Sequence, residues 1–195
     1  GGAARGNAPG GGGAPKRRGG GGPARRAGGE GGGSTMGGIA GGAEALPAYI
    51  NLTASELELG MNAEALQHAE SAVRYAPDVA KTRFVRARAY MRYQRWNEAY
   101  ADLKKAVQIQ GDDALHHTFL GEVSQELGLH LEAIREFETA LRLDNGANYI
   151  WLELGFSAAI LGDFQKAAEA YQKAQRYSGT NNPRVQALGR LISGG

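Results

Sequence analysis

Alanine recurs along this sequence at a fixed spacing of 34 residues, in two parallel series. The first series is Ala65, Ala99, Ala133 and Ala167, and the second is Ala72, Ala106, Ala140 and Ala174. A period of this length is typical of arrays of helical hairpins, in which each unit buries its apolar face against the next. Small residues recur because two antiparallel helices approach closely only where the side chains at their crossing are small. The repeat therefore predicts a protein that binds a partner and does not itself catalyse a reaction.

Four copies of the repeat follow one another without a gap, and each predicts a helix of about 13 residues, a tight turn and a second helix. They span residues 46–79, 80–113, 114–147 and 148–181. Three of the four first helices are followed by glycine, which closes a helix in the left-handed conformation without a steric penalty. Gln94 takes that place in the second copy, so we expect a more strained turn there. Residues 183–192 restart the first-helix pattern, which predicts either a capping helix or a truncated array.

Glycine and basic residues dominate the start of the chain, and apolar residues recur at helical spacing only from Leu46. Twenty of the 31 glycines fall within residues 1–42, together with six basic residues and a lone Glu30. A segment with so little apolar surface cannot offset the entropy of ordering it, so residues 1–45 predict a disordered tail or linker. One folded, mildly acidic domain is expected at 46–192, although the net charge of the whole chain is +2.

The motifs of common catalytic and metal sites are missing from the sequence. It contains no cysteine, which rules out disulfides and thiolate zinc sites, and it has neither a phosphate-binding loop nor a nucleophile elbow. His116 and His117 are adjacent, so on a helix their rings point about 100° apart and cannot converge on one ion. We expect no enzymatic activity, cofactor or metal, and we expect the His117 ring to pack at an aromatic position of its helix.

No apolar run in the sequence approaches the ~18–20 residues that a membrane-spanning helix needs. The N-terminus also lacks the apolar core of a secretory signal. These features predict no membrane span and favour a cytoplasmic location, although a leader cleaved before Gly1 would leave no trace in the sequence.

Leucine–glycine pairs support the same repeat as the two series of alanines. They are Leu120-Gly121, Leu154-Gly155 and Leu188-Gly189, with Trp151 three residues before Leu154. Together with the 34-residue period, these residues resemble the tetratricopeptide repeat (TPR) over residues 46–192. The second copy departs from the pattern with Arg86-Ala87, where we expect a carboxylate partner for the arginine. The resemblance implies an all-α, right-handed α-solenoid of four helix-turn-helix repeats plus a C-terminal capping helix, with the first helices lining a concave groove for partner peptides.

By this resemblance, a peptide segment of another protein would lie along the first helices. The groove candidates are Ile50, Phe84, Arg88, Met91, Arg92, Leu115, Glu122, Glu126, Tyr149, Leu152 and Phe156. Exposed apolar patches mark interaction sites and aromatic residues are enriched at binding hot spots, so Phe84 and Tyr149 are the predicted anchors. The alternative is that some apolar residues of the first helices, Leu152 and Ile160 above all, pack between neighbouring first helices or under the capping helix.

Charged residues in the same groove suggest how a partner is selected. Arg88 and Arg92 share a helix face, and they either recognise acidic residues of a partner or pair with Glu122 and Glu126 of the next copy. Some TPR proteins hold the C-terminal carboxylate of chaperone tails with basic and amide side chains. The matching positions here are Ile50, Ala54, Val85, Leu115 and Phe119, none of which can make that contact.

The sequence thus predicts a non-catalytic adaptor, scaffold or assembly factor, and it leaves two alternatives open. Arginine pairs at 17–18 and 25–26 would give salt-sensitive binding of RNA. The tail has no aromatic residue, however, and we favour a soluble tether or linker. The other alternative is self-association through an uncapped end of the array. The sequence does not fix the oligomeric state.

Overall fold

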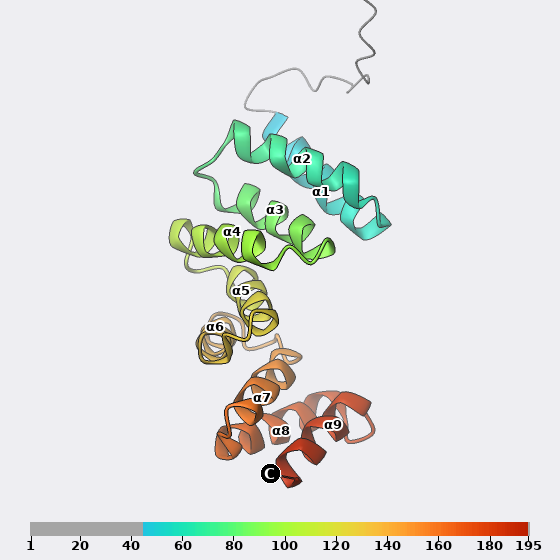
Figure 1. Cartoon of the computed structure of the whole chain (residues 1–195), viewed down its shortest axis with the longest axis vertical. Coiled ribbons are helices and arrows are strands. Elements are labelled where there is room, and N and C mark those ends of the chain that lie inside the picture. The colour runs from blue at the N-terminus through green and yellow to red at the C-terminus, as the bar shows by residue number, and fades with distance from the viewer. Residues whose placement is uncertain (1–44, 195) are drawn as a thin grey trace, which may run out of the picture. The chain divides into compact units, whose positions relative to one another are not determined.

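Residues 45–194 are the part of the chain that the computed structural model describes, and they form nine α-helices and no strand (Figure 1). The helices are α1 (Ala45–Leu59), α2 (Asn62–Tyr75), α3 (Ala80–Arg92), α4 (Trp96–Ile109), α5 (Ala114–Glu126), α6 (His130–Leu143), α7 (Ile150–Ile160), α8 (Phe164–Ser178) and α9 (Pro183–Ser193). The predicted tail, apart from Ala45 at the start of α1, lies outside the described residues.

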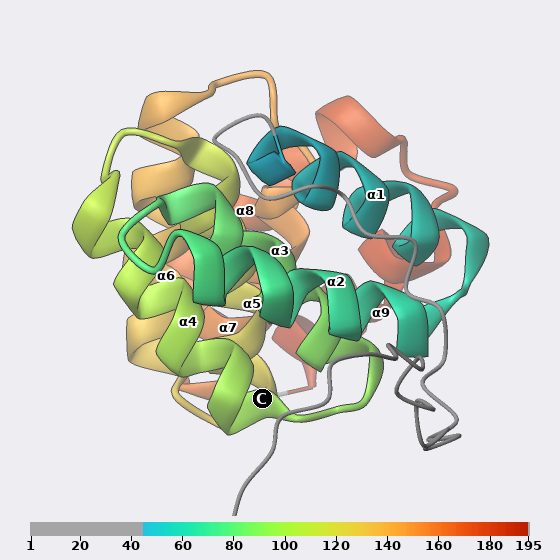
Figure 2. The same cartoon turned by 90° about the horizontal axis from the view of Figure 1, so that it is seen from above.

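The helices pair in the order of the chain. Four hairpins form from α1 and α2, α3 and α4, α5 and α6, and α7 and α8. Each later odd-numbered helix also packs against the even-numbered helix before it, and α9 lies against both α7 and α8. Figure 1 shows the four hairpins stacked in chain order, with α9 next to α7 and α8 at the end, and Figure 2 shows the same helices from above. This stacking confirms the predicted all-α solenoid with a capping helix.

The recurring alanines lie where the helices cross, and all eight are completely buried. The leucine–glycine pairs reflect the same close packing. A side chain at Gly121 would come within 2.5 Å of the Phe137 ring, and one at Gly155 within 2.6 Å of Leu188. Phe137 and Leu188 are themselves fully buried. Glycine therefore allows a bulky side chain to pack closely against the helix backbone, from within the same hairpin at Gly121 and from the capping helix α9 at Gly155.

The turn inside each hairpin places one residue in the left-handed backbone region. Gly60, Gly128 and Gly162 have φ values of 76°, 74° and 76°, and Gln94 has a φ of 56° at the matching place. A residue with a Cβ atom is strained in this region, whereas glycine is not. The structure thus confirms the predicted strained turn between α3 and α4.

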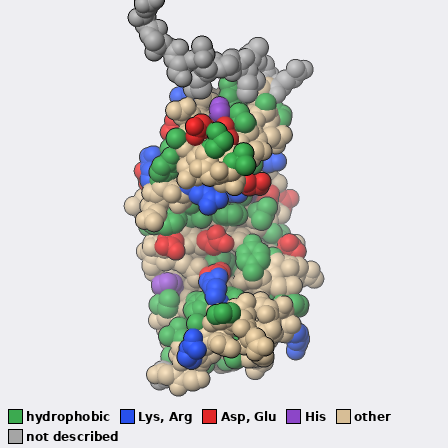
Figure 3. All heavy atoms as spheres, turned by 90° about the vertical axis from the view of Figure 1, so that its right-hand side faces the viewer, with side chains coloured by type: hydrophobic (Ala, Val, Ile, Leu, Met, Phe, Trp, Pro, Cys, Tyr) green, Lys and Arg blue, Asp and Glu red, His purple; other side chains and the backbone are tan. Residues whose placement is uncertain are grey.

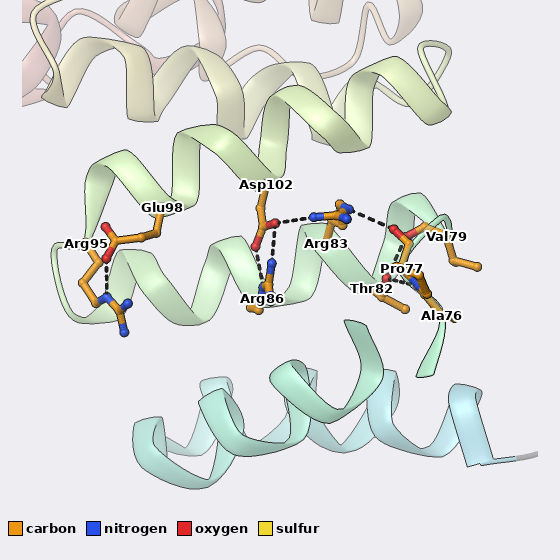
Figure 4. Close-up of polar contacts among 9 residues, drawn as sticks. All are labelled: Ala76, Pro77, Val79, Thr82, Arg83, Arg86, Arg95, Glu98 and Asp102. Carbon is orange, nitrogen blue, oxygen red and sulfur yellow. Dashed lines mark hydrogen bonds and ion pairs between the residues drawn. The ribbon is translucent and has the colours of Figure 1, made fainter. Parts of the chain in front are cut away.

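A buried carboxylate joins the two helices of the second hairpin (Figure 4). Asp102 of α4 accepts hydrogen bonds from Arg86 Nε at 2.6 Å and Arg86 Nη2 at 2.7 Å, and from Arg83 Nη1 at 3.1 Å. The hydrogen bond to Asp102 is the largest cause of the raised pKa of Arg86. The structure therefore confirms the predicted carboxylate partner of Arg86.

His117 joins the two helices of the third hairpin in a similar way. Its Nδ1 lies 2.6 Å from Glu136 Oε2, and its Nε2 lies 3.0 Å from the carbonyl oxygen of Gly111. The ring is buried, as the sequence predicts. The neighbouring His116 ring packs instead against Phe84 of α3, with 4.9 Å between the ring centroids.

None of the helices within residues 45–194 combines the length and the apolar character that crossing a membrane requires.

Candidate binding groove

Three of the predicted groove residues are part of the hydrophobic core. Ile50, Phe84 and Leu152 are 7 %, 8 % and 4 % exposed. Phe84 packs edge-to-face on the Phe119 ring of α5, with 5.2 Å between the centroids. The prediction that Phe84 is an exposed anchor is therefore wrong, because this face of α3 is covered by the next first helix. Leu152 packs as the alternative interpretation expects.

Other apolar candidates do reach the surface. Leu115 and Tyr149 are 52 % and 49 % exposed. More than half of the Ile160 side chain is also exposed, although the alternative interpretation placed it between helices. Phe156 is partly buried against the core that includes Val185 and Leu188 of α9. The guanidinium of Arg184 lies 5.6 Å from the centroid of the Phe156 ring. Of the two predicted aromatic anchors, only Tyr149 is accessible to a partner.

Five predicted residues line two adjoining clefts formed by α3, α5, α7 and the start of α4. The first cleft, of about 300 Å³, is lined by Arg88, Met91, Arg92, Trp96 and Phe119. The second cleft, of about 220 Å³, is lined by Met91, Trp96, Glu122, Gln125, Glu126 and Glu153. Because Met91 and Trp96 line both clefts, we treat the two as one surface, the central groove.

Trp96, Phe119 and Glu153 line the central groove but are not among the groove residues that the sequence predicts. Trp96 begins the second helix of its hairpin, and the resemblance assigns the groove to the first helices only. Glu153 belongs to a first helix, but in the sequence it is one of many carboxylates. Its distinguishing feature is the ion pair with Arg184, which lies 31 positions further along the chain, so no local pattern reveals it.

The basic half of the central groove lies on α3. The Arg88 guanidinium is held over two aromatic rings, 5.9 Å from the centroid of Phe84 and 5.6 Å from that of Phe119. Arg92 Nη2 donates a hydrogen bond to the carbonyl oxygen of Leu57 at 3.2 Å. Among the ion pairs of residues 45–194, none joins either arginine to Glu122 or Glu126. The ion pairs between these arginines and these glutamates, which the sequence left as one possibility, are therefore not formed.

The acidic half of the central groove lies on α5 and α7. Glu153 Oε1 forms an ion pair with Arg184 Nη1 at 2.6 Å. The pKa of Glu122 is raised to about 7, mainly because burial disfavours its charged form and secondly because Glu153 adds a like charge, while Arg184 acts in the opposite direction. Gln125 Nε2 donates to the carbonyl oxygen of Glu153 at 2.9 Å and to Ser157 Oγ at 2.8 Å, which ties α5 to α7.

The central groove thus has an apolar floor, guanidinium donors on one side and carboxylate acceptors on the other. Figure 3 shows one face of the molecule, on which a row of acidic side chains lies between basic side chains above and below it. Within residues 45–194, no three histidine, aspartate or glutamate side chains are grouped so that they could hold a metal ion.

Comparison with known proteins identifies the repeat. Two models of the tetratricopeptide repeat match the sequence, one over residues 56–123 and the other over residues 120–183. No curated protein matches it.

Solved structures resemble the fold. A crystal structure of MamA protein is 22 % identical with a TM-score of 0.70, and the match covers 78 % of this chain and 84 % of that one. The first TPR of Spaghetti (RPAP3), bound to an HSP90 peptide, is 20 % identical with a TM-score of 0.59, over 64 % of this chain and 99 % of that one. YrrB, described as a TPR protein with an unusual peptide-binding site, is 16 % identical with a TM-score of 0.61, over 74 % and 82 %.

Proposed function

Because this chain belongs to the tetratricopeptide repeat family, we propose that it is a non-catalytic adaptor or scaffold that binds a segment of a partner protein in the central groove. The observation that carries the proposal is the groove itself, where α3, α5 and α7 bring apolar and charged side chains to one open surface. The RPAP3 repeat, which holds an HSP90 peptide, and YrrB, which has a peptide-binding site, share the fold and support this role.

The apolar contacts of the proposed site extend along α5. Leu115, Phe119, Glu122 and Glu126 are separated by four, three and four residues, so they lie on one face of that helix. Leu115 is exposed at the N-terminal end of this face, while Phe119 and Glu122 line the groove. Tyr149 lies near Glu122: the pKa of the tyrosine is raised mainly by burial and secondly by the charge of this carboxylate. We therefore assign the anchoring role to Leu115 and Tyr149 in place of the buried Phe84.

Site-specific photocrosslinking tests this proposal. A photoreactive amino acid replaces Met91, which lines both clefts, and in a matched control it replaces Lys105, which is exposed on α4. Each protein is illuminated in lysate of the native host, and crosslinked proteins are identified by mass spectrometry. We expect a protein that crosslinks through position 91 only. Equal crosslinking at both positions, or none at position 91 with the helical circular dichroism intact, contradicts the proposal.

The two other functions that the sequence suggests stay predictions. RNA binding depends on the tail, which lies outside the described residues apart from Ala45. Self-association depends on an uncapped end, whereas Val185 and Leu188 of α9 are fully buried against the preceding hairpin. Neither of these two functions has structural support comparable to that which the central groove gives to peptide binding.

A further inference from the structure

The two halves of the central groove carry opposite charges on either side of a shared apolar floor. Arg88 and Arg92 line only the first cleft, and Glu122, Glu126 and Glu153 line only the second. Met91 and Trp96 lie between them and line both. A bound segment therefore meets positive charge, apolar surface and negative charge in a fixed order.

The arginines of the basic half have N–H donors that remain available to a partner. A guanidinium offers five N–H donors, and its planar fork matches a carboxylate in two parallel hydrogen bonds. Arg92 uses one such donor, on the carbonyl oxygen of Leu57. Arg88 is positioned by the rings of Phe84 and Phe119, and within residues 45–194 it contacts no carboxylate at ion-pair distance. Both side chains are thus held at the cleft with donors available to an acidic residue.

The acidic half keeps excess negative charge, which lies chiefly on Glu126 because the raised pKa of Glu122 leaves that carboxyl partly protonated near pH 7. Arg184 neutralises Glu153, whereas Glu122 and Glu126 form no ion pair within the described part of the chain. Glu126 is exposed and Glu122 is partly buried beside it, one helical turn away on α5. A lysine or arginine side chain of a partner would replace the missing cation.

We propose that the central groove selects an extended segment in which an apolar residue is flanked by an acidic residue, facing α3, and by a basic residue, facing α5 and α7. The inference rests on the proposed function and specifies its ligand. Neighbouring packed helices lie about 8–10 Å apart and an extended chain advances about 3.3 Å per residue, so side chains that face α3 and α5 fall within a stretch of roughly five residues. A wholly acidic or wholly basic segment would place like charges together in one half of the groove, which disfavours it.

Selection from a random peptide library tests the proposal. Phage displaying random dodecapeptides are panned against the full chain, and the enriched peptides are synthesised and their Kd values measured by fluorescence anisotropy. We expect enriched peptides to share an acidic, an apolar and a basic residue within roughly five positions, in one constant direction along the peptide.

Reversing the charge of one exposed residue in each half of the central groove shows which half binds the acidic residue of the peptide and which half binds the basic one. Arg92→Glu is expected to exchange the acidic preference for a basic one, and Glu126→Lys the basic preference for an acidic one. Each variant is expected to weaken a wild-type peptide about tenfold, an effect that falls as salt is added. The matched controls Lys105→Glu and Glu169→Lys reverse exposed charges on second helices and are expected to leave the Kd unchanged.

The outcomes separate this inference from the function on which it rests. Peptides that crosslink through a photoreactive residue at position 91, but lack the charged flanks or ignore both reversals, overturn the inference and leave groove binding in place. If no peptide is enriched and none crosslinks at position 91, both proposals fail. A preference that shifts with the control variants as strongly as with Arg92→Glu and Glu126→Lys also overturns the inference.

Discussion

Arg184 Nη1 lies 2.6 Å from Glu153 Oε1, and this ion pair connects α9 to a helix that lines the central groove. The same guanidinium lies over the Phe156 ring of α7. The side chain of Arg184 is 59 % exposed, while that of Glu153 is 17 % exposed. The capping helix thus covers the apolar end of the array and also sets the charge of the groove.

Replacing Arg184 tests this second role. In Arg184→Gln, the positive charge that opposes the raised pKa of Glu122 is lost, so that pKa is expected to rise further. The loss of stability should be below about 1 kcal/mol, because the arginine is mostly exposed. Titration of the Glu122 carboxyl carbon by NMR measures the pKa, with Arg190→Gln on the same helix as the control. A pKa that stays the same in Arg184→Gln contradicts the electrostatic link.

Glu122 makes stability depend on pH between about 4.5 and 7. Its pKa is raised to about 7 in the folded state from 4.5, so the folded protein binds more protons than the unfolded chain in this window. The free energy of unfolding therefore decreases as pH rises from 4.5 to 7, and the penalty is complete above pH 7. Glu153 of α7 and Arg184 of α9 are the charged groups that act on this carboxyl.

Glu122→Gln removes this contribution. Relative to wild type, the variant is expected to gain about 1–3 kcal/mol at pH 8 and much less at pH 5. Urea unfolding at both pH values measures the difference, and Glu126→Gln, at an exposed position, is the control. A gain of the same size at both pH values would show that burial of the charge is not its cause.

Phe84 and Tyr149 are expected to differ sharply in their effect on folding. Phe84→Ala removes a ring that packs on His116 and Phe119, so it should lower the free energy of unfolding by about 3–5 kcal/mol. Tyr149→Ala changes a half-exposed side chain and should cost about 1 kcal/mol or less. Thermal and urea unfolding followed by circular dichroism compare the two variants. Equal losses of stability would place Phe84 outside the core.

Gln94 offers a simple way to stabilise the protein. Gln94→Gly relieves a side chain held at a φ of 56° and is expected to raise the free energy of unfolding by about 0.5–1 kcal/mol. The reverse change at the matching turn, Gly128→Gln, should lower it by a similar amount, since nothing lies within 4 Å of a Cβ atom there and only backbone strain changes. Urea unfolding tests both. If Gln94→Gly does not raise the free energy of unfolding and Gly128→Gln does not lower it, the turn stores no strain.

The fold could be predicted because its determinants repeat along the chain. The alanines of the 34-residue series meet at helix crossings, and glycine or Gln94 adopts the left-handed turn, since both outcomes depend on residues within one hairpin. The partner of Arg86 was predictable for a related reason. A charge at a buried position of the repeat requires an opposite charge on the neighbouring helix, and Asp102 supplies it.

The groove was predictable only in outline, because its surface depends on contacts between hairpins. Helical spacing places Phe84 and Arg88 on the same side of α3, but it does not show that α5 covers the phenyl ring and leaves the guanidinium at the cleft. Nor does it show that Arg184 reaches Glu153 from the last helix. Periodicity fixes the direction of each side chain about its own helix axis. The angle and distance between neighbouring helices decide which of these side chains are buried, and they follow from the packing of whole side chains across the stack.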